Sequence, residues 1–435
     1  MLLSERILRT LAAGISDASG GGLRRVEVEL DLDPFDLVRS GASAFGFAAC
    51  FSSPEGRAIG ALGVARRFSA SGHGRFGAID ADIVGLERDL PVLIGFSFDE
   101  AGPAAVEWEG FGAATAVVPE VAVIGDGGRT RLVLVLAPGS DGQAVLGQLA
   151  TMPRVEAPRS RPDDTPPQME ERPPPSEYLG EVDEAVAAIR AGAMRKVVLA
   201  RSVTVKRSLP IDPFDLAARL RDLHPSCRVF AWQEGEGAFV GASPELLVER
   251  RGETFHLSPL AGSARRDPDA GRDRRLGEAL LASDKDRWEH EIVVEDAMAR
   301  LEPLVTTLHR SPSPRLERFG SVQHLATPIG GTTSSRLLEL AGALHPTAAV
   351  GGYPRNEAVA FIAKIEGFDR GWYTGGVGWA DSGGDGELAI ALRCALVRGD
   401  RVTAFAGSGI VAESEPAAEL EETRLKLAPI VEVLS

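Results

Sequence analysis

Short apolar runs separated by glycine-rich turns follow one another through residues 1–150. Such runs are typical of β-strands, and the clearest are VEVEL, SAFGFAACF, PVLIGFSF, ATAVVPEVAVI and TRLVLVLA. Ahead of them, MLLSERILRTLAAG places charged residues among apolar ones, which predicts a short amphipathic helix and not a signal peptide. GDGG at 125–128 indicates a turn, because no lysine or helix start follows it as in a phosphate-binding loop. We therefore expect a β-rich N-terminal part without a chemical motif.

A segment rich in proline and charge, TMPRVEAPRSRPDDTPPQMEERPPPSEY, interrupts this pattern at residues 151–178. Because it contains few apolar residues, it predicts an exposed, extended surface linker. Long surface insertions are tolerated within one domain, so the linker can still join two parts of a single fold. We divide the chain accordingly into residues 1–150, the linker 151–178 and a C-terminal region, 179–435.

Strand and helix patterns are mixed after the linker. Strands are expected at 196–205, 227–233, 237–250, 253–260, 372–380, 387–397 and 401–411. Helices are expected at 181–194, 212–223, 273–309, 334–343, 355–366 and from about Ser414 onward. The two kinds of element do not alternate strictly, which disfavours a Rossmann or barrel fold.

Composition and charge narrow the classes of partner. The hydrophobic fraction of 44% and the charged fraction of 25% are those of a globular protein. No apolar stretch is long enough to cross a bilayer and no targeting segment is found, so we expect a cytoplasmic protein. The net charge of −15 argues against nucleic acid or an anionic membrane as partner. Three cysteines far apart, Cys50, Cys227 and Cys394, argue against a disulfide framework or a zinc site.

Carboxylates gather on two predicted helices. In the last helix, Ser414 is a plausible N-cap and Pro416 suits the first turn. Glu419, Glu422 and Lys426 then follow at spacings that place them on one face.

The earlier helix DKDRWEHEIVVEDA likewise places Asp286 and Glu289 on one face. Two such pairs can converge on a hard divalent cation, and oxygen ligands favour Mg²⁺ over zinc. From spacing alone, however, two solvated helix faces are the favoured interpretation.

Arg393 stands within the apolar run ELAIALRCALV. If this run is one strand, the guanidinium needs an anionic partner, because an unpaired buried charge is unfavourable. That partner is either an internal carboxylate or a carboxylate of the substrate, and both interpretations are open. The residues that would share its strand face are small and apolar: Ala389, Ala391, Ala395 and Val397.

Other polar residues carry weaker signals. Lys196 opens the predicted strand KVVLAR, where a lysine usually reaches the surface. Glu245 precedes apolar residues that favour a retained proton, as a general acid requires, although a strand-edge glutamate fits equally. GSGIV at 407–411 can offer backbone N–H groups to an anion, although a tight turn is commoner. His290 and His324 lack metal-ligand spacing and are interpreted as hydrogen-bonding residues.

The order and spacing of ten segments are distinctive where single residues are not. Together they resemble the chorismate-utilising enzymes, which include isochorismate, salicylate, anthranilate and aminodeoxychorismate synthases. The resemblance covers about residues 178–432 and implies a large α/β fold of the α+β type, with a two-sheet core flanked by helices, to which residues 1–150 add strands. The segments are KVVLAR, GASPELL, PLAGSARR, KDRWEHE, HLATPIGG, HPTAAVGGYP, FDRGWYTGGVGW, IALRCA, FAGSGIV and ELEETRLKL.

The resemblance also implies site residues. Glu289 and Glu422 match ligands of a Mg²⁺ ion that holds the ring carboxylate of chorismate. Asp286 and Glu419 match supporting ligands, and the short arm of Asp286 suggests contact through water. The other matched positions surround the substrate: Arg393, Tyr373 and Gly409 at the enolpyruvyl carboxylate, Lys426 near the metal and ring carboxylate, and Gly262, Ser263 and His324 around the ring.

Three positions separate the activities within the family. Lys196 matches the lysine that activates water in isochorismate and salicylate synthases, which conflicts with an ammonia-using enzyme and a glutaminase partner. Ala261 stands where aminodeoxychorismate synthases carry a nucleophilic lysine. Ala326 in HLATPIGG resembles isochorismate synthases more than salicylate-forming members.

The resemblance therefore implies a Mg²⁺-dependent isomerase, a monomer, that converts chorismate into isochorismate. Lys196 is the expected base and Glu245 the expected acid. The alternatives are a salicylate synthase, which goes on to eliminate pyruvate, and a catalytically silent relative. Both menaquinone and siderophore synthesis are open as destinations of the product.

Overall fold

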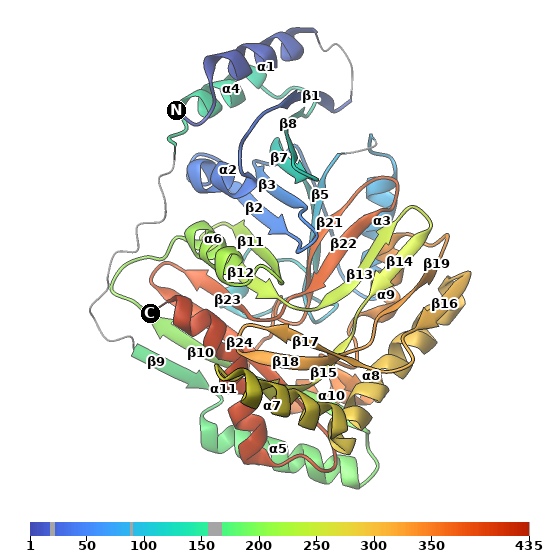
Figure 1. Cartoon of the computed structure of the whole chain (residues 1–435). Helices are drawn as coiled ribbons and strands as arrows, with labels where there is room; N and C mark the ends of the chain where they lie inside the picture. Colours follow the sequence, from blue (N-terminus) through green and yellow to red (C-terminus); the bar gives the residue numbers. More distant parts are fainter. Residues whose placement is uncertain (18–21, 88–89, 155–167, 435) are drawn as a thin grey trace.

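The computed structural model describes residues 1–17, 22–87, 90–154 and 168–434. Antiparallel strands form two large sheets and one small sheet, and helices cover the outer faces (Figure 1). This agrees with the two-sheet core flanked by helices that the sequence predicts. Within the described residues, no helix combines the length and the apolar character that a bilayer span requires.

A 12-stranded sheet extends along the molecule, from the end that carries α1 and α4 towards the end that carries α5 (Figure 1). Strands from before residue 150 pair directly with later ones, since β2 lies between β3 and β11. The first 150 residues thus share one sheet with the rest of the chain. In order, the strands are β1 (Arg24–Glu29), β8 (Arg129–Leu136), β7 (Val121–Asp126), β3 (Ala58–Leu62), β2 (Phe47–Ser52), β11 (Arg228–Glu234), β12 (Gly237–Ser243), β23 (Cys394–Arg398), β24 (Arg401–Ile410), β10 (Lys196–Lys206) and β20 (Gly352–Tyr353), with β9 (Gln168–Arg172) also on β10.

A nine-stranded sheet packs against the first, and a three-stranded sheet lies beside them. The nine strands are, in order, β16 (Thr307–Arg310), β19 (Ile329–Thr332), β14 (Thr254–Leu257), β13 (Leu246–Arg251), β22 (Gly386–Ile390), β21 (Gly376–Ala380), β5 (Val92–Phe96), β6 (Ala114–Val118) and β4 (Arg66–Ala70). The small sheet consists of β15 (Leu260–Arg265), β18 (Val322–Ala326) and β17 (Arg315–Phe319).

The strand period of two explains how both faces of the large sheet are buried. In β2, Phe47 and Phe51 point into the core between the two sheets, whereas Ala48 and Cys50 point to the opposite face. That opposite face is covered by helices. The helices of the chain are α1 (Glu5–Asp17), α2 (Pro34–Gly41), α3 (Arg75–Val84), α4 (Gly142–Thr151), α5 (Pro175–Arg190), α6 (Pro213–Leu223), α7 (Ala270–Ala282), α8 (Asp284–Leu301), α9 (Leu337–Leu344), α10 (Arg355–Ile365) and α11 (Pro416–Val433), with short 3-10 turns at Val106–Trp108 and Glu302–Leu304.

Several apolar runs that predicted one strand form two. Residues 237–250 divide into β12 and β13, 387–397 into β22 and β23, and 114–124 into β6 and β7, with the members of each pair in different sheets. Because both sheets are buried, each run is apolar on both sides of the crossing, and only a few residues at the crossing itself are not: Pro119 and Glu120, Pro244 and Glu245, and Arg393. The predicted helix at 273–309 likewise divides into α7 and α8 at Ser283, whose side chain caps α8. Its predicted end is wrong, because α8 ends at Leu301 and Thr307–Arg310 forms strand β16.

The described part of the predicted linker is more ordered than its composition indicates. Residues 155–167 lie outside the described residues, but Gln168–Arg172 pairs with β10 as strand β9. Pro175 begins α5, where proline suits the first turn, and Tyr178 is fully buried. An edge strand leaves charged side chains in water while its backbone is paired, so composition alone misses it.

Candidate active site

One cavity collects most of the residues that the resemblance singles out. The predicted residues that line it are Lys196, Glu245, Gly262, Ser263, Glu289, His324, Tyr373, Arg393, Glu422 and Lys426, together with Ala261. Nine further lining residues carry no charge and were not predicted: Val198, Pro244, Leu260, Ala349, Val350, Thr374, Leu392, Phe405 and Ala406. Gly407, from the segment GSGIV, also lines the cavity. Asp286, Glu419 and Gly409 are not among the lining residues.

The cavity lies where the chain crosses between the two large sheets. Pro244 and Glu245 stand between β12 and β13, and Leu392 and Arg393 stand between β22 and β23. Arg393 (φ 45°) and Thr374 (φ 61°) are the non-glycine residues of the described chain with positive φ. Such backbone strain concentrates at functional sites, and both residues line the cavity.

Arg393 therefore does not lie within a single strand, and the prediction that it shares a strand face with Ala389 and Val397 is wrong. Its guanidinium contacts His324 Nε2 at 2.8 Å and donates to the Phe319 carbonyl at 3.4 Å. Burial lowers the pKa of Arg393. Among the described residues no carboxylate forms an ion pair with it, so an internal counter-ion does not account for this buried charge.

His324 acts as a hydrogen-bond acceptor toward Arg393. A guanidinium has only donors, so Nε2 accepts, and Nδ1–H is left to donate to Gly262 O at 3.2 Å or Ser263 Oγ at 3.1 Å. Burial, and next Arg393, lower the pKa of His324 well below its usual value. A neutral imidazole thus fixes the direction of the guanidinium.

Glu245 and Lys196 are both buried, at 3% and 1% exposure. Burial raises the pKa of Glu245 to about 7, against the opposing effects of the Leu260 N–H and the charges of Lys196 and Lys426. Lys196 does not reach the surface, as an ordinary strand lysine would. Its Nζ lies 3.0 Å from Oε1 of Glu289.

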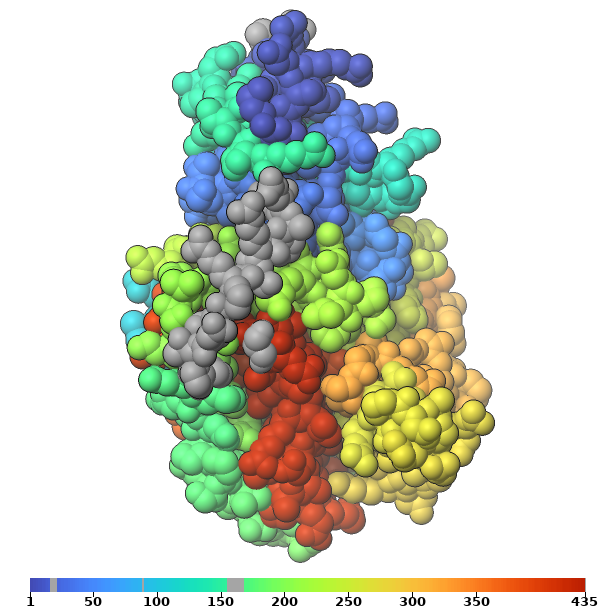
Figure 2. Space-filling view, turned by 60° about the vertical axis from the view of Figure 1, so that its left-hand side comes forward, coloured from blue at the N-terminus to red at the C-terminus, as the bar shows by residue number. Residues whose placement is uncertain are grey.

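The carboxylates of α8 and α11 face one another across these two helices. Lys285 of α8 pairs with Glu419 of α11 at 3.0 Å, which brings the first turns of the two helices together. Glu289 and Glu419 are buried, so they do not form solvated helix faces. Figure 2 shows the C-terminal helix (red) at the surface between the segments around residues 175–190 (green) and 270–300 (yellow).

Like charges oppose one another in this cluster. Burial, and next the charge of Glu289, raise the pKa of Asp286 against the hydrogen bond from Ser283. Burial and the charge of Glu422 raise that of Glu419 against Lys285. A hard divalent cation would relieve this repulsion, and the oxygen donors suit Mg²⁺.

The side chains are nevertheless not arranged as a formed metal site. Within the described ranges, no three Asp, Glu, His or Cys residues are grouped closely enough to hold an ion. Instead, lysine side chains form ion pairs with the carboxylates, as between Lys426 Nζ and Glu422 Oε1 at 2.7 Å. The carboxylate oxygens are nevertheless suitable ligands for Mg²⁺. When Mg²⁺ binds, these oxygens would coordinate the ion in place of their ion pairs with lysines. The sequence analysis did not predict a role for Lys285, because the spacing of residues within α8 does not reveal that Lys285 contacts Glu419 of α11.

The ends of β24 and α11 differ from their predictions. Residues 407–410 belong to β24 and do not form a turn. A side chain at Gly409 would place its Cβ 2.2 Å from Glu289 Oε1, so glycine is required for that carboxylate to approach the strand. Ser414 is not the N-cap of α11, because Glu415 occupies that position and the Ser414 hydroxyl accepts from the Val411 N–H.

Ala326 is fully buried but is not among the residues that line the cavity. It pairs with Leu260 on the neighbouring strand β15. An effect of this position on the choice between isochorismate and salicylate stays a prediction. Ala261, in contrast, does line the cavity.

Comparison with known proteins gives consistent matches. The family model described as "Chorismate binding enzyme" matches residues 22–435. The salicylate biosynthesis isochorismate synthase of Pseudomonas aeruginosa is 38% identical over 434 residues, covering 94% of this chain and 90% of that protein. Isochorismate synthase MenF of Bacillus subtilis is 36% identical over 351 residues, covering 79% and 74%. The structure of MenF, the menaquinone-specific isochorismate synthase from Escherichia coli, matches with a TM-score of 0.86 and 28% identity, covering 98% of this chain and 99% of that chain.

Proposed function

This chain belongs to the chorismate-binding enzyme family, and we propose that it is an isomerase that converts chorismate into isochorismate. The observation that carries this proposal is the presence of a buried lysine and a buried glutamate of raised pKa in one cavity. A water-activating base and a proton-donating acid are what a hydroxyl transposition needs. The names of the relatives from Pseudomonas aeruginosa and Bacillus subtilis support the same activity.

The cationic side chains of the cavity suit a substrate with two carboxylates. Arg393, anchored by His324 and without an ion-pair partner among the described residues, would bind the enolpyruvyl carboxylate together with Tyr373. Lys426 would lie near the ring carboxylate. This local positive charge overcomes the repulsion between a dianion and a protein of net charge −15.

The reaction then moves a hydroxyl group from C4 to C2 of the ring. Lys196 accepts a proton from a water molecule whose oxygen bonds to C2. The double bonds of the ring shift, and the C4–O bond breaks as Glu245 donates its proton to the departing hydroxyl, which leaves as water. One water is consumed and one is released, so the net change is an isomerisation.

The carboxylates that would hold Mg²⁺ are Glu289 and Glu422, with Asp286 and Glu419 in support. The ion, when bound, would neutralise the ring carboxylate and fix the position of the ring. Glu289 also pairs with Lys196, so one carboxylate would connect the metal ligands with the residue expected to act as base.

Substitution of Glu422 by alanine is expected to lower turnover at least about 100-fold and to abolish its dependence on Mg²⁺, because a metal contributes several kcal/mol of charge stabilisation. Calorimetry should show weakened Mg²⁺ binding. The matched control is Glu421→Ala on the same helix, where Glu421 is exposed and pairs with Arg424. If Glu422→Ala and Glu421→Ala titrate alike with Mg²⁺, Glu422 is not a ligand.

Product analysis tests the proposed function itself. Incubation of the protein with chorismate and Mg²⁺, followed by chromatography, should yield isochorismate without pyruvate. Stoichiometric pyruvate with fluorescent salicylate would replace the proposal by a salicylate synthase. Lack of any turnover in a folded, Mg²⁺-supplied preparation would indicate a silent chorismate-binding relative.

A further inference from the structure

A buried arginine behind the cavity joins three segments of its wall. Arg370 follows α10 and forms a two-pronged ion pair with Glu366, with Nε to Oε2 at 2.7 Å and Nη2 to Oε1 at 2.5 Å. Both side chains are almost completely excluded from solvent, at 3% and 2% exposure. Neither lines the cavity.

The remaining donors of Arg370 reach the backs of cavity-lining residues. Nη2 donates to the carbonyl of Val198 at 2.7 Å, and Nη1 donates to that of Val350 at 2.9 Å and to Thr374 Oγ1 at 3.4 Å. A guanidinium has five N–H donors, and with the two bonds to Glu366 all five are used. Arg370 therefore has no donor left for a substrate and can act only through its neighbours.

One of these neighbours is the strand that carries the predicted base. Lys196 begins β10, and Val198 lies two residues further on. Glu366 Oε1 also accepts from the N–H of Ala200 at 2.8 Å. The Arg370–Glu366 ion pair thus bonds to the β10 backbone at Val198 and Ala200, two and four residues after Lys196.

A second neighbour is the Tyr373–Thr374 segment, which has a strained backbone at Thr374. The N–H of Tyr373 donates to the Arg370 carbonyl at 2.9 Å. Thr374, with its left-handed backbone, bonds to the Arg370 side chain and, through its carbonyl, to Nε2 of buried His345 at 3.0 Å. A residue in such a conformation persists only where its surroundings fix it.

Stability alone does not account for this ion pair. Burying two charges is unfavourable, and apolar residues of similar volume often serve a core as well or better. What an apolar pair cannot provide is directional bonds to Val198, Val350 and Thr374 at once. Reacting groups need placement within fractions of an ångström, and a 1 Å error can lower a rate about 100-fold.

We propose that Arg370, clamped by Glu366, is a positioning residue that fixes the Lys196 strand against the Tyr373–Thr374 wall of the cavity. The proposal rests on the proposed function, since it concerns the geometry of that reaction. Of the residues proposed to bind the substrate, Arg393 and Lys426 have no hydrogen bond or ion pair with Arg370 or Glu366 among the described residues, and Tyr373 bonds to the Arg370 carbonyl, which a side-chain substitution retains. Loss of the clamp should therefore affect turnover more than affinity.

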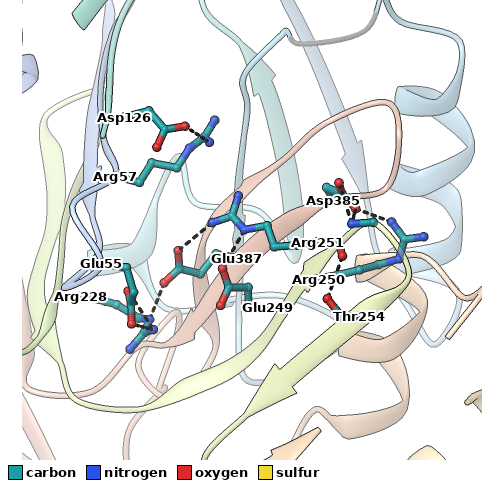
Figure 3. A network of polar contacts seen from close by, with 11 residues as sticks. Glu55, Arg57, Asp126, Arg228, Glu249, Arg250, Arg251, Thr254, Asp385 and Glu387 are labelled. Atoms are coloured by element: carbon teal, nitrogen blue, oxygen red, sulfur yellow. Dashed lines mark hydrogen bonds and ion pairs between the residues drawn. The ribbon is translucent and has the colours of Figure 1, made fainter. Parts of the chain in front are cut away.

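The test is Arg370→Lys, which keeps the charge but cannot make five directed bonds. The matched control is Arg228→Lys in the network of Figure 3. Arg228 also pairs with a buried glutamate, Glu387, at 2.6 Å between Nε and Oε1, and it joins β11 to β22 across the two large sheets. No residue labelled in that network lines the cavity.

For Arg370→Lys, kcat should fall about 100-fold while KM for chorismate changes less than about threefold. Arg228→Lys should lower the melting temperature comparably and leave kcat within about threefold of wild type. Equal kcat values for the two variants, measured well below both melting temperatures, would overturn the proposal. Because the comparison requires an active wild type, an inactive wild type would refute the proposed function and not the clamp.

If Arg370→Lys does not fold, Glu366→Gln and its control Glu387→Gln take its place. The amide keeps an oxygen for the Ala200 N–H but loses the charged, two-pronged contact with Arg370. Its kcat should fall about tenfold relative to Glu387→Gln, again with little change in KM. A ratio within about twofold would contradict the inference.

Discussion

Substitution of Lys196 by glutamine is expected to reduce kcat about 1000-fold, within the range that a positioned acid or base contributes. Glutamine is similar in length but cannot accept a proton from water at neutral pH. Lys196 is buried at the start of β10 and lines the cavity, so no solvent base can easily replace it. Steady-state kinetics with chorismate and Mg²⁺ measure the loss, and calorimetry should still detect chorismate binding.

Lys196 also pairs with Glu289, so its substitution removes an ion-pair partner from the carboxylate cluster. Lys285→Gln provides the control, because Lys285 pairs with Glu419 in the same cluster but does not line the cavity. If loss of a counter-ion were the cause, both variants would lose turnover equally. A Lys196→Gln enzyme within tenfold of wild-type kcat would remove Lys196 from the role of base.

The importance of Lys196 could be predicted only from the order of motifs along the chain. Taken alone, a lysine at the start of an apolar strand is expected to reach water, whereas the structure buries it beside Glu289. Ten ordered segments carry more information than any single residue, since they constrain identity and spacing together. Most substrate-site residues inferred in this way, such as Arg393 and Tyr373, do line one cavity.

The places where the chain crosses between sheets could not be predicted from the apolar pattern. Apart from Glu387 and Arg393, residues 387–397 are apolar because both sheets are buried, so no turn signal marks the bend at Arg393. Ser243 and Pro244 do mark a corner before Glu245, but they do not reveal that the chain changes sheets between β12 and β13. The uncharged lining residues, such as Val198 and Phe405, were missed because nothing in an apolar run distinguishes a cavity wall from a core.

Contacts between helices could not be predicted from the sequence either. The spacing of Glu419 and Glu422 gives their common face on α11, but not the lysines that meet them. Nor does a sequence reveal that Arg370 uses every donor on backbone and side chains behind the cavity. Such partners are set by packing between segments far apart in the chain.

Glu245→Gln is expected to reduce kcat about 1000-fold at pH 7, because glutamine fills the same space but cannot protonate the departing C4 hydroxyl. Since burial raises the pKa of Glu245 to about 7, the acid is protonated below that pH and ionised above it. Wild-type kcat should therefore fall about tenfold for each pH unit well above 7. The residual kcat of Glu245→Gln should lack this descending limb, and a limb retained unchanged would assign the acid to another group.

The pH dependence of stability distinguishes the loss of proton donation in Glu245→Gln from a loss of activity through unfolding. A carboxyl group whose pKa is raised on folding contributes stability at low pH that is lost as pH rises through the folded-state value. Wild type should therefore lose stability between pH 5 and pH 8.5 as the buried Glu245 ionises, whereas Glu245→Gln has no charge to bury. Because burial raises the pKa of Glu245 from 4.5 to about 7, the free energy of unfolding of the variant should increase by about 2 kcal/mol relative to that of wild type over this pH interval, as measured by urea unfolding. A Glu245→Gln protein that is inactive yet relatively more stable at pH 8.5 would identify proton donation as the function that it lacks.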